Sequence, residues 1–228
     1  MMKAALIIPA AGRGTRFGAE IKKPYVELGG RAIFLRTLDR FAGIEEISFR
    51  IVVVSAEDLE FVRTTFGAEL ERLGVDRILP GGRERYDSVS AALAAVPADC
   101  DLVAIHDAVR PLVPVAAVRE ALEVAERIGA ACVGMPLVET VKRATSAGII
   151  EATVPRERLW GAQTPQVFRT ELIRLAYGRR EKIAGALTDD AQLVEALGHP
   201  VALVTGSREN IKITTPEDLR LAEALLDK

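Results

Sequence analysis

Short, nearly continuous apolar runs alternate along this chain with stretches in which apolar residues recur at helical spacing. Five of the runs predict strands, at residues 3–9, 49–55, 101–107, 130–136 and 201–206. They are rich in Val and Ile and alternate little with polar residues, which suits strands buried on both faces of a parallel sheet. The order of strands and helices therefore predicts an α/β fold with a Rossmann-like, doubly wound, mostly parallel sheet.

Two of the intervening helices carry clear signals for where they begin and end. One opens near Pro114 and stops at Gly129, because proline suits the first turn of a helix and glycine suits its end. The last helix is indicated by Thr215 as the cap and Pro216 at the first helical position, with two acidic residues in the first turn.

Residues 138–154 break this pattern, because two β-prone arms flank the turn Ser146-Ala147-Gly148. We expect a projecting β-hairpin arm over residues 138–156 that pairs with a second copy of the chain, with a surface flap as the alternative. The sequence shows no internal repeat and no linker. Residues 1–228 are therefore expected to form a single domain that carries this arm.

Composition excludes several classes of protein. The chain has 228 residues, of which 49% are hydrophobic and 27% charged, as in globular domains. Its net charge of −2 argues against a general nucleic-acid or membrane-surface binder, and it has no apolar run of about 20 residues. Cys100 and Cys132 form no metal-binding or disulfide pattern, so both are expected to be buried free thiols in the cytoplasm.

A glycine-rich segment, PAAGRGTRFG at residues 9–18, follows the first predicted strand. In open α/β sheets ligands bind at the carboxyl ends of the strands, and glycines there let backbone N–H groups approach phosphate oxygens. Gly12, Gly14 and Gly18 have the spacing of neither the dinucleotide fingerprint nor the P-loop. Both of those nucleotide-binding motifs are excluded here.

Cations concentrate around this loop. Between residues 12 and 31 there are five basic residues and two acidic ones, a local excess of three positive charges in a chain of net charge −2. A solvated basic loop is the plainer interpretation. Glycines and cations together at the end of a strand favour a polyphosphate site.

Four later motifs follow in order: GGRERYDSV (81–89), HDAVRP (106–111), LWGAQTPQVF (159–168) and TDDA (188–191), with NIKITTPEDL (210–219) after them. Together with the loop they resemble the 2-C-methyl-D-erythritol 4-phosphate cytidylyltransferase family of the non-mevalonate isoprenoid pathway. The resemblance covers essentially the whole chain. It implies a homodimeric enzyme that uses Mg²⁺ to transfer CMP from CTP to 2-C-methyl-D-erythritol 4-phosphate, releasing pyrophosphate.

The resemblance also assigns roles to residues. Arg16 and Lys23 would stabilise the reacting α-phosphate and the leaving pyrophosphate, while Arg156 and Lys212 would position the acceptor phosphate beside Thr140. CTP would be bound by the loops and side chains of Ala10, Ala11, Gly12, Gly14, Gly82, Ser88 and Asp107. Arg83 stands where the family can have an acidic residue, so cytosine recognition is assigned to the backbone near Gly82 and to Ser88.

Asp107 ends a buried predicted strand and should face the ligand crevice. A carboxylate beside a triphosphate most simply binds Mg²⁺, which prefers one or two carboxylates plus phosphates. A helix-capping aspartate is the alternative, because a helix is expected soon after.

Other functions remain open at this stage. A cytidylyltransferase for another polyol phosphate, such as ribitol 5-phosphate, would share the CTP side and differ on the acceptor side. A nicotinamide-dependent oxidoreductase is disfavoured by the glycine spacing. A nucleotide sensor without catalysis is disfavoured by the presence of both Arg16 and Lys23.

Overall fold

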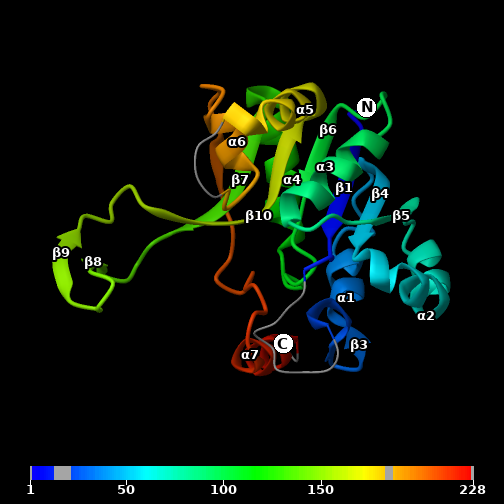
Figure 1. Ribbon diagram of the computed structural model, residues 1–228, viewed down its shortest axis with the longest axis horizontal. Helices are drawn as coiled ribbons and strands as arrows, with labels where there is room; N and C mark the ends of the chain where they lie inside the picture. The colour runs from blue at the N-terminus through cyan, green and yellow to red at the C-terminus, as the bar shows by residue number, and fades with distance from the viewer. Residues whose placement is uncertain (1, 13–21, 183–186, 227–228) are drawn as a thin grey trace.

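A computed structural model describes residues 2–12, 22–182 and 187–226 of the chain. Its centre is a seven-stranded sheet in the order β11-β7-β10-β6-β1-β4-β5 (Figure 1). The strands are β1 (Ala4–Pro9), β4 (Ile47–Val54), β5 (Arg77–Pro80), β6 (Leu102–Ile105), β7 (Ala130–Pro136), β10 (Trp160–Arg169) and β11 (Ala202–Thr205). Within this sheet β10 alone runs antiparallel to its neighbours, so the predicted mostly parallel α/β fold is confirmed.

The five predicted strands are present, but the sheet has two strands that the apolar pattern did not predict. β5 is a four-residue edge strand with no buried side chain. β10 contains Pro165, which lacks an N–H group and argues against a central strand. The ladder between β10 and β7 shifts register between Ala162 and Gln166, which accommodates the proline there.

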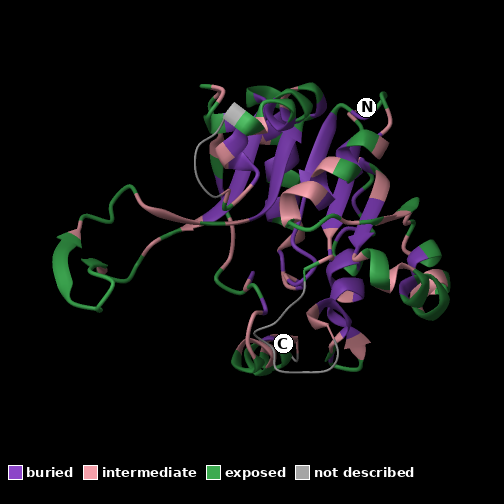
Figure 2. Cartoon of the chain, in the orientation of Figure 1, coloured by how far each residue is buried: buried purple, intermediate pink, exposed green. Residues whose placement is uncertain are grey.

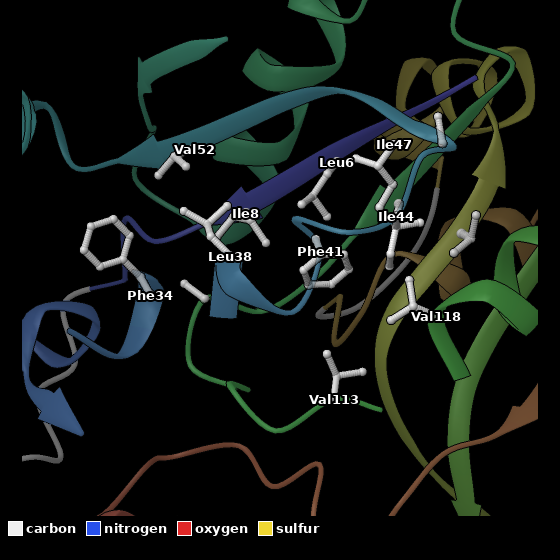
Figure 3. Close-up of a cluster of buried hydrophobic side chains, with 14 of the residues drawn as sticks. Leu6, Ile8, Phe34, Leu38, Phe41, Ile44, Ile47, Val52, Val113 and Val118 are labelled. Atoms are coloured by element: carbon white, nitrogen blue, oxygen red, sulfur yellow. The ribbon is translucent and has the colours of Figure 1, made fainter. Parts of the chain in front are cut away.

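Helices cover both faces of the sheet because alternate strand residues point to opposite sides. Leu6 and Ile8 of β1 pack with Phe34 in the cluster of Figure 3. Ala5 and Ile7 belong to the opposite cluster. The first cluster is covered by α1 (Ile33–Asp39), α2 (Leu59–Arg72) and α4 (Val115–Ile128); the second by α3 (Arg85–Ala95), α5 (Thr170–Gly178) and α6 (Ala191–Glu195). Figure 2 shows the resulting buried sheet.

The expected helix ends are confirmed. Pro114 caps α4, and Gly129 ends it in the left-handed conformation with φ 108°. The last helix, α7 (Pro216–Leu226), begins where Asp218 Oδ2 accepts hydrogen bonds from the backbone N–H groups of Thr214 and Thr215, both at 2.8 Å. None of the helices in the described ranges has the length and apolar character that a bilayer span requires.

A small third cluster places the last helix beneath the strand ends. There α7 packs near β2 (Glu27–Leu28) and β3 (Arg31–Ala32), a short antiparallel ribbon. The segment that leads into α7 is anchored to the loop after β6, because the N–H group of Ile213 bonds to the carbonyl of Val109 at 2.9 Å. Lys212 is therefore carried past the end of the sheet.

The expected hairpin is also present. β8 (Val141–Ala144) and β9 (Ile150–Val154) pair antiparallel, and Gly148 takes φ 79° in the turn between them. The hairpin projects away from the sheet and is exposed along its length (Figures 1 and 2). Ile149 and Ile150, at its far end, are 66% and 62% exposed. Pairing of this arm with a second copy stays a prediction.

Candidate active site

A cavity of about 620 Å³ lies at the carboxyl ends of the parallel strands. The loops that follow β1, β4, β5 and β6 all contribute to its wall, together with the turn at Lys23 and the segment at Lys212. This is the place where an open α/β sheet is expected to bind its ligand.

The cavity brings together most of the residues that the sequence indicated. Its wall contains Ala10, Ala11, Gly12, Lys23, Gly82, Ser88, Asp107 and Lys212. Two predicted residues, Thr140 and Arg156, lie instead on the projecting arm, where the Arg156 guanidinium donates to the carbonyl of Val138. Gly14 and Arg16 lie outside the described residues.

A tight turn sets one end of the cavity. A Cβ atom added to Gly81 would lie 2.5 Å from Ser88 Oγ and 2.7 Å from the side chain of Ala11, so only glycine fits there. Ser88 is buried in the first turns of α3, and its hydroxyl donates to the carbonyl of Glu84 at 3.2 Å. The glycine therefore lets this turn pack directly against Ser88 and Ala11 on the cavity wall.

Asp107 lies at the opposite side of the wall, surrounded by cations. Its Oδ2 is 3.0 Å from Lys212 Nζ and 3.2 Å from Arg110 Nε, while its Oδ1 is 3.5 Å from Arg85 Nε. Burial alone would raise the pKa of this carboxyl, but Lys212, Arg85 and Arg110 lower it well below its usual range. Asp107 is therefore ionised at neutral pH.

A buried histidine supports the backbone on both sides of this carboxylate. Thr164 Oγ1 accepts from the Asp107 N–H group at 3.1 Å and contacts His106 Nδ1 at 3.0 Å, and His106 Nε2 lies 3.0 Å from the carbonyl of Arg110. Burial lowers the pKa of His106 to about 4, so the ring is neutral. The contacts fit the tautomer in which Nε2 carries the proton and Nδ1 accepts from Thr164.

Arg85 and Asp190 form a pair that the sequence analysis did not identify. Arg85 Nη2 lies 2.7 Å from Asp190 Oδ2, and the hydroxyl of Tyr177 donates to Asp190 Oδ1 at 2.6 Å. Gln166 Oε1 accepts from the Asp190 N–H group at 3.0 Å. Both partners stand within motifs noted above, but their pairing depends on α3 meeting the loop before α6, which spacing does not reveal.

Asp107 is the candidate ligand for a divalent cation. Among the described residues no group of three or more His, Cys, Asp or Glu side chains is placed to hold a metal. Mg²⁺ commonly takes one or two carboxylates and completes its shell with substrate phosphates and water. Asp107 offers one such carboxylate on the cavity wall, where its oxygens contact Lys212, Arg110 and Arg85.

The profile of 2-C-methyl-D-erythritol 4-phosphate cytidylyltransferase matches residues 4–228. The chain belongs to this family. A 2-C-methyl-D-erythritol 4-phosphate cytidylyltransferase of Desulforamulus reducens is 43% identical over 227 residues, covering 97% of this chain and 95% of that protein. One from Pelotomaculum thermopropionicum is 41% identical, covering 99% of this chain and 95% of that protein. The resemblance noted in the sequence is thus confirmed.

Solved structures of the 2-C-methyl-D-erythritol 4-phosphate cytidylyltransferase family share the fold. The enzyme of Thermus thermophilus superposes with a TM-score of 0.79 at 38% identity, with 100% of both chains covered. The 4-diphosphocytidyl-2C-methyl-D-erythritol synthase of Anaerococcus prevotii gives a TM-score of 0.86 at 30% identity, covering 100% of this chain and 97% of that one. The α/β architecture of this chain is therefore the fold of these solved family members.

Proposed function

We propose that this enzyme transfers CMP from CTP to 2-C-methyl-D-erythritol 4-phosphate, giving 4-diphosphocytidyl-2-C-methyl-D-erythritol and pyrophosphate. The observation that carries the proposal is a strand-end cavity that places Lys23, Lys212 and Asp107 around one space in a chain of this family. The related proteins are named for this acceptor and for this product.

The reaction joins two anions. An oxygen of the acceptor's 4-phosphate attacks the α-phosphorus of CTP in line, the new P–O bond forms, and the bond to the β-phosphate oxygen breaks as pyrophosphate leaves. A phosphate monoester carries about 1.5 to 2 negative charges at neutral pH, so repulsion opposes its approach to a triphosphate. Catalysis therefore depends on positioning and charge neutralisation, and it needs no nucleophile from the protein.

The cations divide between the two substrates. Lys23, at the start of a short turn on the cavity wall, is assigned to the α-phosphate and the leaving pyrophosphate. Arg16 is assigned the same task and lies outside the described residues. Lys212 is assigned to the acceptor phosphate, because its ammonium is held at the cavity by Asp107 and its side chain stays 43% exposed.

Cytosine is assigned to the turn at Gly81-Gly82 and to Ser88. Polar groups that are fixed in a narrow pocket reject a base whose edge leaves them unpaired. The backbone of residues 10–12 is assigned to the phosphates, as expected for a glycine loop after a parallel strand. A divalent cation, Mg²⁺, would be held by the triphosphate and Asp107, where it neutralises phosphate charge and fixes the shape of the chain of phosphates.

The arm is assigned to a homodimer. It carries two large exposed apolar residues, Ile149 and Ile150, and it holds Thr140 and Arg156 at its neck rather than at the cavity. In a dimer built on the arms, Thr140 and Arg156 would complete the acceptor site of the partner. The two buried free thiols, Cys100 and Cys132, suit the reducing cytoplasm.

The test is pyrophosphate release with each of the four nucleoside triphosphates and with two acceptors, 2-C-methyl-D-erythritol 4-phosphate and ribitol 5-phosphate. We expect release only when CTP and 2-C-methyl-D-erythritol 4-phosphate are combined. Preference for ribitol 5-phosphate would assign the chain to another polyol phosphate. Binding of CTP without release in any mixture would make it a nucleotide sensor.

A further inference from the structure

Two adjacent lysines, Lys22 and Lys23, line the cavity, and the structure separates their tasks. The ammonium group of Lys22 lies 2.8 and 2.9 Å from the two carboxylate oxygens of Asp58 and 3.0 Å from Ser55 Oγ. Glu57 adds a longer contact of 3.5 Å. Two carboxylates therefore surround this ammonium group, and its charge is already compensated within the protein.

The carboxylate of Asp58 also contacts Tyr25, the last residue of the short turn that contains Lys23. The hydroxyl of Tyr25 donates to Asp58 Oδ2 at 3.1 Å. The ring of Tyr25 is buried and lies 5.7 Å from Phe34, 5.5 Å from Phe61 and 6.1 Å from Phe66, measured between ring centroids. Aromatic contacts of this kind leave the ring little freedom to move.

Lys23 stands between these two anchored residues. The turn η2 (Lys23–Tyr25) is closed by a bond of 2.9 Å from the Tyr25 N–H group to the Lys22 carbonyl. Asp58 is fixed in turn by Ser55, the residue that follows β4, whose hydroxyl accepts from the Asp58 N–H group at 3.3 Å. The carboxylate thus ties the turn that bears Lys23 to the end of a central strand.

We propose that Asp58 is a positioning residue for the reaction: it holds Lys22 and Tyr25 on either side of Lys23 and so aims Lys23 at the triphosphate. In this arrangement Lys22 fixes the turn and does not bind phosphate. The inference rests on the proposed function through the role given to Lys23. Burial would raise the pKa of Asp58, but Lys22, Ser55 and Tyr25 lower it, so the carboxylate is charged throughout the working range of pH.

The test is a double-mutant cycle on the full-length enzyme, with steady-state kinetics for CTP. Asp58→Asn keeps the size of the side chain and removes its charge. We expect kcat to fall about tenfold with the KM for CTP changed little, because a misplacement of about 1 Å can cost roughly a hundredfold and a smaller one costs less. Glu60→Gln, an exposed carboxylate on α2, is the matched control and should leave kcat unchanged. In a Lys23→Met background, Asp58→Asn should lower kcat less than twofold, because no lysine is left to aim.

Two outcomes overturn the inference: Asp58→Asn without effect on kcat, or an undiminished loss in the Lys23→Met background. A wild-type enzyme that releases no pyrophosphate from CTP and 2-C-methyl-D-erythritol 4-phosphate would instead contradict the proposed function itself. A Lys23→Met enzyme with full turnover would remove only the role assigned to Lys23, so these failures are distinguishable. Lys22→Met supplies a second variant in case Asp58→Asn does not fold. If Lys22 fixes the turn, its replacement should lower kcat, and this effect should be coupled to that of Asp58→Asn. An increase confined to the KM for CTP would instead show that Lys22 binds phosphate and would overturn the assignment.

Discussion

Lys212 Nζ lies 3.0 Å from Asp107 Oδ2, which joins the segment before the last helix to the end of β6. The contact unites two residues assigned to different tasks, one to the acceptor phosphate and one to the divalent cation. Because Arg110 and Arg85 also face this carboxylate, Asp107 organises the charge of this side of the cavity before any substrate arrives. Such preorganised charge is what electrostatic catalysis requires.

Asp107→Asn should destabilise the protein. The substitution leaves Arg110 and Arg85 without their shared anion in a largely buried position, and we expect the free energy of unfolding to fall by about 1–3 kcal/mol. Lys212 adds little to this figure because its side chain is partly exposed and solvent screens it. Urea unfolding measures the change. Glu217→Gln, which breaks a largely exposed pair with Arg220, is the control and should change stability by less than about 0.5 kcal/mol; equal effects would refute the account.

Gly81→Ala should impair CTP binding. The added methyl group would meet Ser88 Oγ at 2.5 Å and the side chain of Ala11 at 2.7 Å, so the turn or these two neighbours on the cavity wall must shift. We expect the KM for CTP to rise about tenfold or more, corresponding to roughly 1.4 kcal/mol of lost binding. Gly67→Ala in α2 is the matched control, since a Cβ there meets nothing within 4 Å. That variant should keep its KM and gain a few tenths of a kcal/mol in stability.

His106 should make the protein less stable in mild acid. Its pKa is about 4 in the folded protein and about 6.5 when unfolded, so between these values the unfolded chain binds a proton that the folded ring does not. The unfolding free energy contributed by this group is complete above pH 6.5 and falls as the pH drops toward 4. Between pH 7.5 and pH 5 the loss amounts to about 2 kcal/mol.

Urea unfolding at these two pH values, on the wild type and on His106→Gln, isolates that contribution. The variant is expected to be less stable at pH 7.5, because it loses the ring contact with Phe41. Its stability should nevertheless fall about 2 kcal/mol less than that of the wild type on acidification. Equal losses in both proteins would show that His106 titrates normally in the folded state.

Ile149 and Ile150 on the arm should be required for dimer formation. Replacing both with Asp places two charges where two exposed apolar side chains project into solvent, which opposes any apolar contact with a second copy. We expect light scattering to report a dimer for the wild type and a monomer for the double variant, with loss of acceptor turnover and retention of CTP binding. A wild-type monomer with full activity would exclude the shared site.

The apolar pattern was sufficient for β1, β4, β6, β7 and β11, because short continuous apolar runs rich in Val and Ile are typical of strands in a parallel sheet. It failed for β10, where Pro165 interrupts the run and the register shift that accommodates it is a property of the pairing with β7. It failed for β5 because this strand has only Ile78 and Leu79 between Arg77 and Pro80, an apolar run too short to predict a strand. The helix at Thr215-Pro216 was predictable because capping is local.

The residues of the candidate site also differ in how far the sequence could place them. Asp107 could be placed at the strand ends because it ends a predicted strand, and Lys23 because it belongs to the cation-rich segment after the first strand; Ser88, inside α3, was placed by the family resemblance. Two ion pairs beside the cavity could not be placed in this way. Asp58 meets Lys22 across the end of β4, and Asp190 meets Arg85 between α3 and α6, so both contacts depend on how separate elements pack.

The central claim is that the acceptor phosphate attacks the α-phosphorus of CTP directly, with the cations of the cavity neutralising both anions. The stereochemical course at that phosphorus tests it most directly, using CTP made chiral by sulfur at the α-position and analysis of the cytidylyl product. A single in-line displacement predicts inversion of configuration. Retention would show two successive displacements through a covalent enzyme intermediate and would contradict the mechanism.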